Sequence, residues 1–383
     1  MKKIAILGIT GSIGISATEV VRQHPNDFEI VLAASNNNYS KLFELAVKFN
    51  IPELVITNSA LSQKITDIPA NSNLTFGEDE LQRKIESVEC DIILNAISGS
   101  AGLRSSITTI SKGVDLALAN KESLVMAGHK IMEMLENSNT KLIPVDSEHS
   151  AILQAIGSSP PNEIQSIIIT ASGGPFRDLP LNEFENITLE DTLKHPTWDM
   201  GAKITIDSAT MMNKGLEVIE AHWLFHKSYD DIKAVIHPQS IVHSFVEFVD
   251  GSILAQLSFP TMQIPILYAL TYPNHIKSTI PKTNILELPN LNFKELSIER
   301  YPLYDIAINA GIQGGILPTV LNASNEAAID LFLDRKICFR YINRIVEKQI
   351  SKFHNFQDPS IEEIININKD VYIQTKQNYR NLI

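Results

Sequence analysis

The sequence predicts an α/β protein that begins with a doubly wound parallel sheet, continues into a central α+β region and ends in helices. Up to about residue 146, short apolar runs alternate with amphipathic segments of helical length. Continuous apolar strands separated by helices are typical of a parallel sheet that is covered on both faces. The chain has 383 residues, more than one compact core usually fills, so we expect more than one domain.

The elements of the first region follow from the period of its apolar residues. Uninterrupted apolar runs predict strands at 3–8, 30–34, 54–57, 91–97, 114–119 and 142–145. Apolar residues that recur every three or four positions predict helices at 13–23, 41–49, 103–112 and 122–135. This alternation is what a doubly wound sheet requires.

The central region has a different pattern. A strand is expected at 164–171, and it ends in Ser-Gly-Gly-Pro, a loop signal. A long polar stretch then runs to about residue 202, and loops of that length are often lids. After it we expect a helix at 209–225, a strand at 235–237, and a hairpin of 241–249 with 252–259 across Asp250-Gly251.

The C-terminal part reads as helices at 304–312, 325–333, 339–353 and 360–367, after a stretch at 273–290 that is rich in Pro and Asn. We therefore expect a first domain at 1–146, a central domain at 147–275 that contains a flexible lid at about 172–202, a linker at 276–300, and a helical domain at 301–383. The last of these would brace the other two.

The composition excludes several classes of protein. Lys and Arg number 32 against 44 Asp and Glu, a formal net charge of −12, which disfavours binding to nucleic acid or an anionic membrane. The two cysteines are far apart, so no disulfide framework or cysteine zinc site is indicated. No apolar stretch reaches the roughly 20 residues of a membrane helix. We expect a cytoplasmic protein.

A glycine motif joins the first strand to the first helix. Gly8, Gly11 and Gly14 would permit a tight turn and let backbone N–H groups approach a pyrophosphate at the helix N-terminus. The second strand ends in Ser35 and three asparagines, without the acid that an NAD site uses for the ribose 2′-hydroxyl. Amides and a hydroxyl can donate to a 2′-phosphate, so NADP is favoured. Alternatively, the asparagines form only a turn.

Two acidic residues follow the last strand of the first region. Asp146 and Glu148 are two positions apart, so in extended backbone they would project to one side, at the edge where such sheets bind ligands. Oxygen ligands without cysteine favour Mg²⁺ or Mn²⁺. The alternative is that one of them caps a helix that begins near Ser147.

A second polar cluster lies on one expected helix and its lead-in. Asn213 and Glu217 share a helix face, and Ser208 precedes them. Lys214 lies about 100° away from Asn213 around the helix axis. An amide, a cation and a carboxylate there could hold a phosphate and complete a metal site. The alternative is a solvated helix face with an ordinary cap.

Weaker candidates remain. Asn120, Lys121 and Glu122 follow a strand end, and could line a nicotinamide pocket or simply begin a helix. His195 and Trp198 in the long polar stretch could close over a ligand. We expect His237 and His243 to be satisfied core histidines, and Met211 and Met212 to serve packing.

The motifs together resemble the 1-deoxy-D-xylulose 5-phosphate reductoisomerase family, in family order over essentially the whole chain. They are residues 8–14, 99–103, LANKESL at 118–124, PVDSEH at 144–149, SGGPFR at 172–177, 195–196, 205–210, MMNKGLE at 211–217, 237–240 and LNASNE at 321–326. The resemblance implies NADPH-dependent conversion of 1-deoxy-D-xylulose 5-phosphate to 2-C-methyl-D-erythritol 4-phosphate, the committed step of the non-mevalonate isoprenoid pathway, by a homodimer.

The resemblance also assigns roles to residues. Asp146, Glu148 and Glu217 would bind Mg²⁺ or Mn²⁺. The substrate would contact Lys121, Ser147, Glu148, Ser172, His195, Trp198, Ser208, Asn213, Lys214 and Glu217. NADPH would contact Thr10, Gly11, Ser12, Ile13, Asn120, Glu122 and Gly201, besides Asn36, Asn37 and Asn38. The catalytic groups would be Lys121 and the three carboxylates. Trp198 would close over the substrate as part of the lid.

Two positions depart from the family pattern. Ile9 stands where the family has a small residue, and Asn37 where it often has a basic one. The second departure leaves the 2′-phosphate to Ser35, the asparagines and Lys41. The rival functions are another two-domain NAD(P)-dependent dehydrogenase of the semialdehyde or homoserine type, and a non-catalytic dinucleotide-binding protein. Neither Cys90 nor Cys338 is placed to be the nucleophile of a semialdehyde dehydrogenase.

Overall fold

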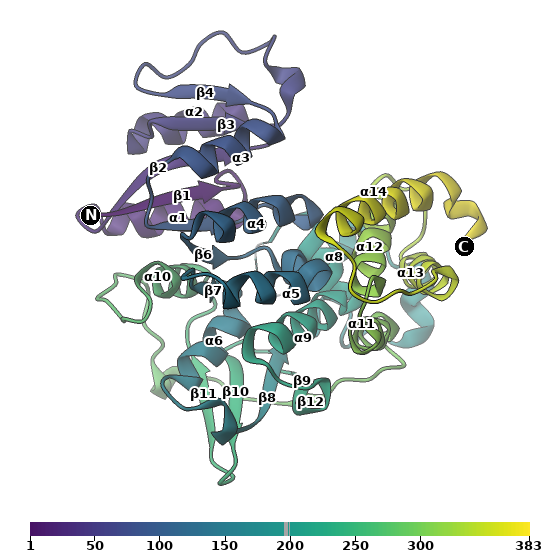
Figure 1. The fold of residues 1–383 in the computed structure, drawn as a ribbon. Helices are drawn as coiled ribbons and strands as arrows, with labels where there is room; N and C mark the ends of the chain where they lie inside the picture. The colour runs from purple at the N-terminus through teal and green to yellow at the C-terminus, as the bar shows by residue number, and fades with distance from the viewer. Residues whose placement is uncertain (195–197, 199) are drawn as a thin grey trace. The chain divides into compact units, whose positions relative to one another are not determined.

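The computed structural model describes residues 1–383 except 195–197 and 199, so the expected site residue His195 lies outside the described residues. The chain forms two compact units (Figure 1). Unit 1 consists of Met1–Asn120, Ile131–Ser150 and Met262–Pro281, and unit 2 of Lys121–Lys130, Ala151–Thr261 and Lys282–Ile383. Each unit is therefore built from segments that are distant in the sequence.

Unit 1 contains a seven-stranded sheet in which every pair of neighbouring strands is parallel. Its order is β4-β3-β2-β1-β5-β6-β7. The strands are β1 (Lys2–Leu7), β2 (Phe28–Ser35), β3 (Glu53–Ile56), β4 (Asn73–Phe76), β5 (Ile92–Asn95), β6 (Asp115–Leu118) and β7 (Leu142–Pro144). The chain order reverses at β1 and β5, and such a switch point is where open α/β sheets bind their ligands. The expected doubly wound sheet is confirmed.

The helices of unit 1 connect and cover these strands. They are α1 (Ser12–Gln23), α2 (Tyr39–Phe49), α3 (Glu78–Ser87), α4 (Leu103–Lys112) and α10 (Gln263–Thr271), with the 3₁₀ turns η1 (Ser59–Leu61) and η2 (Gly99–Gly102). α5 (Lys121–Glu136) and α6 (Ser147–Ile156) run across the boundary of the two units. Right-handed crossovers place α1 and α2 on the face opposite α3 and α4, because the two pairs connect strands in opposite directions along the sheet.

Three elements of unit 1 were not expected from the sequence. β4 is a four-residue edge strand with no buried side chain, so it carries no apolar run. α3 buries only Leu81 and Ile85, too few to show a helical period. α10 lies in an apolar stretch with Pro265 in its first turn, a position that a helix tolerates although proline usually indicates a break.

Unit 2 contains a mixed five-stranded sheet of order β11-β10-β8-β9-β12. The strands are β8 (Ile164–Ala171), β9 (Ile232–Ile236), β10 (Val242–Phe248), β11 (Ile253–Leu257) and β12 (Lys294–Glu295). The helices are α7 (Leu189–Thr192), α8 (Ala202–Thr210), α9 (Met212–Phe225), α11 (Pro302–Gln313), α12 (Leu317–Leu333), α13 (Arg340–Lys352) and α14 (Ile361–Asn378). Short 3₁₀ turns are η3 (Pro161–Glu163), η4 (Leu181–Asn186), η5 (Tyr229–Asp231), η6 (Ile285–Glu287) and η7 (Tyr379–Asn381).

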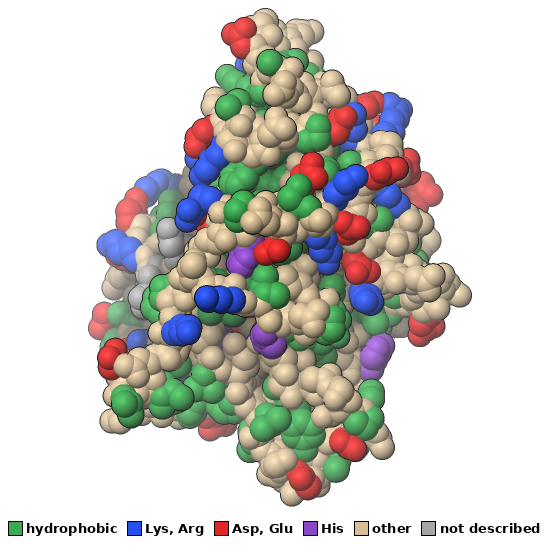
Figure 2. All heavy atoms as spheres, turned by 90° about the vertical axis from the view of Figure 1, so that its left-hand side faces the viewer, with side chains coloured by type: hydrophobic (Ala, Val, Ile, Leu, Met, Phe, Trp, Pro, Cys, Tyr) green, Lys and Arg blue, Asp and Glu red, His purple; other side chains and the backbone are tan. Residues whose placement is uncertain are grey.

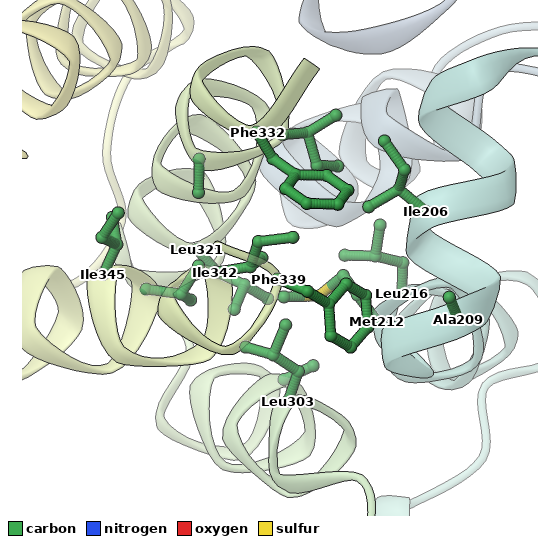
Figure 3. Close-up of a cluster of buried hydrophobic side chains, with 14 of the residues drawn as sticks. Ile206, Ala209, Met212, Leu216, Leu303, Leu321, Phe332, Phe339, Ile342 and Ile345 are labelled. Atoms are coloured by element: carbon green, nitrogen blue, oxygen red, sulfur yellow. The ribbon is translucent and has the colours of Figure 1, made fainter. Parts of the chain in front are cut away.

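The core of unit 2 joins the C-terminal helices to α8 and α9. Figure 3 shows Ile206 and Met212 facing Leu303 and Phe339 inside one cluster of buried side chains. The single helix expected over 209–225 is wrong. The chain forms two helices instead, because Met211 adopts a left-handed backbone conformation with φ of 60° that ends α8 and begins α9.

The described part of the stretch at 172–202 differs from the loop that its polar sequence predicts. It contains η4 and α7, and Phe176 and Ile187 are buried in the same cluster. The rings of Phe176 and Phe339 lie 5.4 Å apart, edge to face. The first part of the expected lid is therefore packed against the C-terminal helices. None of the helices in the described part of the chain is both long enough and apolar enough to cross a bilayer.

Candidate functional site

The glycine motif forms a close turn between β1 and α1. Gly8 has φ of 84°, and a Cβ placed there would lie 2.5 Å from the carbonyl oxygen of Ala96, in the loop after β5. A Cβ on Gly14 would lie 2.4 Å from Cα of Ile9. Both positions therefore require glycine. Ile9 is fully buried, so its bulk faces the core of unit 1.

Gly11 differs from the other two glycines because a Cβ there would make only an ordinary van der Waals contact. It is the N-cap of α1, and a Cβ placed there would come no closer than 3.4 Å to the Gly8 carbonyl oxygen, its nearest neighbour. Thr10, beside it, shares a hydrogen bond with Ser35 at the end of β2, Oγ1 to Oγ 2.8 Å. Gly11 is exposed, so the turn offers an accessible helix N-terminus, the arrangement that accepts an anionic group.

The three asparagines after β2 make different hydrogen bonds. Asn38 caps α2, and its side-chain oxygen accepts from the backbone N–H of Lys41 at 3.1 Å. This bond gives Asn38 a local role at the start of α2. Asn36 and Asn37 are exposed and accept hydrogen bonds from Thr57 and Asn58 after β3. Lys41 pairs with Glu44 at 2.8 Å.

Asn120 is a buried link between strand ends. Its amide nitrogen donates to the carbonyl oxygens of Ile97 at 2.8 Å and Gly99 at 2.7 Å. A Cβ on Gly102 would lie 2.4 Å from the same amide group. Asn120 therefore fixes the loop after β5 at the switch point of the sheet. It is followed directly by Lys121, where α5 begins.

The sequence left two geometries open for the acidic pair after β7, and the structure has the one in which a helix begins near Ser147. Helix α6 begins at Ser147, so Glu148 lies in its first turn and the extended backbone assumed for Asp146 and Glu148 is wrong. The physical reason is that the helix starts directly after Asp146, whose carbonyl oxygen accepts from Ser150 N–H at 2.8 Å. The Ser147 hydroxyl donates to the Glu148 carboxylate.

A buried polar cluster in unit 2 joins the start of α5 to the first turns of α9. The Lys121 ammonium donates to Asn213 Oδ1 at 2.9 Å and to Glu217 Oε1 at 3.3 Å. Lys214 donates to the other oxygen of Glu217, and the Asn213 amide to the first. Glu217 is 1% exposed. The shared helix face expected for Asn213 and Glu217 is present, and the cluster is buried rather than solvated.

Ser172 and Ser208 lie in segments that touch. A Cβ on Gly174 would lie 2.7 Å from the carbonyl oxygen of Ser208, so the loop after β8 can approach the end of α8 only because it carries glycine there. The Ser172 hydroxyl accepts from Gly174 N–H at 3.2 Å, and the Tyr301 hydroxyl donates to the Gly173 carbonyl at 2.8 Å. The structure thus holds two expected phosphate ligands on adjoining segments of unit 2.

A buried charge network that the sequence analysis missed centres on Lys203. Its ammonium lies 2.7 Å from Glu122 Oε1 and 3.0 Å from Asp207 Oδ2. Asp207 also accepts from the amide of Asn325 on α12 at 2.7 Å. The spacing of four residues between Lys203 and Asp207 on one helix is the sequence signal that could have found it.

The network sets the charge of its members. Burial opposes the ionised form of Glu122, but the neighbouring Lys203 ammonium lowers its pKa below the ordinary value. Burial likewise opposes the charge of Lys203, but Asp207 and Glu122 raise its pKa. Both groups are therefore charged around neutral pH, and they tie the segment next to Lys121 to the helix that carries Ser208.

The remaining candidates are single residues. The Trp198 ring lies 6.2 Å from the ring of His243 on β10. Gly201, the N-cap of α8, is exposed and has open space around it. His237 is fully buried and satisfied on both sides: its Nδ1 faces the Asn292 carbonyl at 2.9 Å and its Nε2 accepts from Ile241 N–H at 3.1 Å. Met212 packs in the core, as expected.

Family models match three parts of the chain. The model of the 1-deoxy-D-xylulose 5-phosphate reductoisomerase family matches residues 4–128, and two models of the C-terminal domains of this reductoisomerase match 142–225 and 257–373. Together they cover most of the sequence. The chain belongs to the 1-deoxy-D-xylulose 5-phosphate reductoisomerase family.

Relatives agree over the full length. The chain is 41% identical to the reductoisomerase of Clostridium perfringens (strain 13 / Type A), with 99% of this chain and 100% of the relative aligned. It is 44% identical to the reductoisomerase of Clostridium novyi (strain NT) over the same shares of the two chains. The resemblance seen in the sequence motifs is confirmed.

Solved reductoisomerase structures have the same fold. One, in complex with NADPH, fosmidomycin and magnesium, matches with a TM-score of 0.94 at 36% identity and covers 99% of this chain and 98% of its own. The reductoisomerase of Zymomonas mobilis in complex with NADPH matches with a TM-score of 0.90 at 37% identity, covering 98% of each chain.

Proposed function

We propose that this protein converts 1-deoxy-D-xylulose 5-phosphate to 2-C-methyl-D-erythritol 4-phosphate with NADPH and a divalent metal ion. The observation that carries the proposal is the buried cluster of Lys121, Asn213, Lys214 and Glu217 in a chain that belongs to the reductoisomerase family over its full length. A binding protein without turnover gains nothing from such a cluster, which is costly to bury. Family membership disfavours the other dehydrogenases.

NADPH fits the features of unit 1. The exposed Gly11 leaves the N-terminus of α1 accessible to a pyrophosphate, with Thr10, Ser12 and Ile13 on the same turn. Asn36 and Asn37 provide amide groups at the end of β2, where an NAD enzyme would carry an acid. Asn38, Asn120, Glu122 and Gly201 complete the proposed contacts. The bound cofactor supplies the hydride.

A divalent cation fits the donor set of Asp146, Glu148 and Glu217. Three carboxylates without a thiol suit Mg²⁺ or Mn²⁺. When bound, the metal would supply Lewis-acid polarisation of the substrate carbonyl and a template for its hydroxyl. The two ammonium groups that hold Glu217, from Lys121 and Lys214, are themselves proposed substrate contacts, so they would bring positive charge to the substrate beside the metal.

The substrate phosphate would be held by Ser172, Ser208, Asn213 and Lys214, with His195 as a further ligand. Ser147 and Lys121 would face the carbon skeleton. Because the phosphate is remote from the reacting carbons, its binding free energy would drive closure of the proposed lid at about 172–202, with Trp198 over the substrate, and so exclude water from the reaction. In this proposal the domains expected at 1–146, 147–275 and 301–383, with the linker at 276–300, keep their roles in cofactor binding, catalysis and bracing.

A homodimer is the proposed assembly, and strand β11 is its proposed contact. β11 lies at the edge of the sheet of unit 2, and all of its residues except Gln256 are exposed, including Ile253 at 53%, Leu254 at 51% and Leu257 at 40%. Figure 2 shows hydrophobic side chains gathered at the lower end of the view, the level of the β10–β11 hairpin in Figure 1. An exposed edge strand has backbone N–H and C=O groups that can pair with a strand of another chain. A second copy of this chain would cover β11.

The proposed location is the cytoplasm. Both cysteines, Cys90 and Cys338, are free thiols, which suits a reducing compartment.

The proposed function is tested by product analysis. The purified protein is incubated with NADPH, Mg²⁺ or Mn²⁺ and 1-deoxy-D-xylulose 5-phosphate, and the product is examined by NMR. We expect the branched carbon skeleton of 2-C-methyl-D-erythritol 4-phosphate. A product that keeps the straight skeleton of the substrate would contradict the proposal. The assignment of Glu217 as the third metal ligand is tested by Glu217→Gln. If this variant keeps wild-type turnover at saturating Mn²⁺, Glu217 is not a ligand.

A further inference from the structure

We propose that Asn58 is a positioning residue for cofactor choice, because it turns the side chain of Asn37 so that its amide N–H groups face the 2′-phosphate of NADPH. This inference rests on the proposed use of NADPH. It assigns the selection of NADPH over NADH in part to Asn58, a residue in the loop after β3.

The register of the sheet brings the two residues together. β2 and β3 are parallel neighbours in which Ser35 pairs with Ile56, the last residue of each strand. The loops that follow are joined by backbone bonds, from Thr57 N–H to the Ser35 carbonyl at 3.0 Å and from Asn58 N–H to the Asn36 carbonyl at 3.4 Å. Asn58 therefore lies directly behind the loop where the adenine ribose of a dinucleotide binds.

A chain of two hydrogen bonds fixes which way the amides point. The side-chain oxygen of Asn58 accepts from the backbone N–H of Ala60 at 3.0 Å, where it caps η1. A backbone N–H can only donate, so the other end of the Asn58 amide is its nitrogen. That nitrogen lies 2.7 Å from Asn37 and must meet an acceptor, which is Oδ1 of Asn37.

The orientation of Asn37 decides what it offers to a ligand. Asn37 is exposed, and because its Oδ1 accepts from Asn58, the end of its amide directed away from Asn58 is the NH₂ group, which carries two donors and no acceptor. Two donors suit a phosphate dianion. The reverse orientation would present an oxygen and repel it, while a ribose hydroxyl could bind either end. The hydrogen bond from Asn58 thus holds Asn37 in the orientation that favours NADPH over NADH.

Two substitutions at Asn58 separate this role from its cap. Asn58→Ser keeps an oxygen that can cap η1 but removes the amide nitrogen that donates to Asn37. Asn58→Asp also keeps the cap, and it replaces the donor with an acceptor that would draw the Asn37 NH₂ group inward. Asn71→Ala is the matched control, since Asn71 donates to Asn50 at 3.2 Å in another exposed pair of asparagines in unit 1.

The measurement is the dissociation constant of each full-length protein for NADPH and for NADH by fluorescence titration. We expect the preference for NADPH to fall about threefold in Asn58→Ser and about tenfold or more in Asn58→Asp, with NADH affinity and the control unchanged. An unchanged preference in both variants, or a fall in Asn58→Asp alone, overturns the inference, the latter because added charge would explain it. A wild-type protein that binds neither dinucleotide overturns the proposed function itself.

Discussion

The ammonium of Lys203 and the carboxylate of Glu122 form a buried ion pair, with Nζ 2.7 Å from Oε1, that joins α8 to the start of α5. The adjoining residues on the two helices include the proposed substrate ligands Ser208 and Lys121. The pair therefore links the part of unit 2 that would hold the phosphate to the part that would face the carbon skeleton.

Removal of the Lys203 charge is expected to destabilise unit 2. Lys203→Met would leave the carboxylates of Glu122 and Asp207 buried without their cation, which costs about 3–5 kcal/mol of unfolding free energy. Urea unfolding followed by circular dichroism measures it. Lys336→Met is the control, because Lys336 and Asp334 form an exposed pair, 50% and 49% accessible, and its loss should change stability by less than about 0.5 kcal/mol. Equal losses in the two variants would contradict the structural role of the network.

The same pair predicts a pH dependence. The pKa of Glu122 is lowered in the folded state, so its ionisation stabilises the protein above the unfolded pKa of about 4.3, and this stability is lost as pH falls through the folded pKa. Glu122→Gln should therefore be less stable than wild type at pH 7, by about 1–3 kcal/mol. The difference should shrink as pH falls below the unfolded pKa of about 4.3 and through the lower pKa of Glu122 in the folded state. A difference that is constant between pH 7 and pH 3 would argue against an ionised Glu122.

Alanine substitutions at two glycines of the turn after β1 should have different effects, one on stability and the other on NADPH binding. Gly14→Ala forces a Cβ within 2.4 Å of Ile9 Cα, so it should lower the unfolding free energy by about 1–3 kcal/mol. Gly11→Ala meets nothing nearer than 3.4 Å and should fold normally, but its methyl group would enter the proposed pyrophosphate space and weaken NADPH binding about tenfold. Titration calorimetry with NADPH and thermal unfolding separate the two effects. Wild-type affinity in Gly11→Ala would show that the cofactor does not use this turn.

Trp198 is expected to act on the sugar rather than on the nucleotide. Trp198→Ala removes the ring that lies beside His243, and should lower kcat/KM for 1-deoxy-D-xylulose 5-phosphate by about 10- to 100-fold. The dissociation constant for NADPH should change less than about twofold. Steady-state kinetics and fluorescence titration supply the two numbers. Equal losses in both would refute a role in closing over the substrate.

Strand β11 should govern the assembly. Leu254→Glu places a charge on the exposed apolar edge and should convert a dimer into a monomer in sedimentation velocity. Val47→Glu is the control, since Val47 on α2 is an isolated exposed residue, 71% accessible. A protein that stays dimeric with Glu at position 254 would place the contact elsewhere.

The sequence predicted the parallel sheet because its strands are buried on both faces and therefore appear as unbroken apolar runs. It missed β4 and α3, whose few buried residues leave no period. The pair Asn213 and Glu217 was predictable from helical spacing. The break at Met211 was not, because a left-handed residue depends on tertiary contacts. The start of α6 near Ser147 was foreseen only as the alternative to an extended backbone. The network around Lys203 joins three helices distant in sequence, so its partners could not be predicted from local spacing, Asp207 excepted.

The net charge of −12 at first disfavours anionic ligands, yet both proposed organic ligands are phosphorylated. The structure resolves this locally. Backbone N–H groups at the start of α1 and the ammonium groups of Lys121 and Lys214 provide donors where they are proposed to bind. Part of the excess acid, in the three proposed metal ligands, would bind a cation that attracts the substrate.

The central claim is tested most directly by the initial rate of NADPH oxidation, followed at its absorbance maximum, in the presence of 1-deoxy-D-xylulose 5-phosphate and Mn²⁺. We predict rapid oxidation in the complete mixture, loss of activity after chelation of the metal, recovery when Mn²⁺ or Mg²⁺ is restored, and no oxidation without the phosphosugar. Oxidation that continues at the same rate without metal, or none in the complete mixture, would contradict the account.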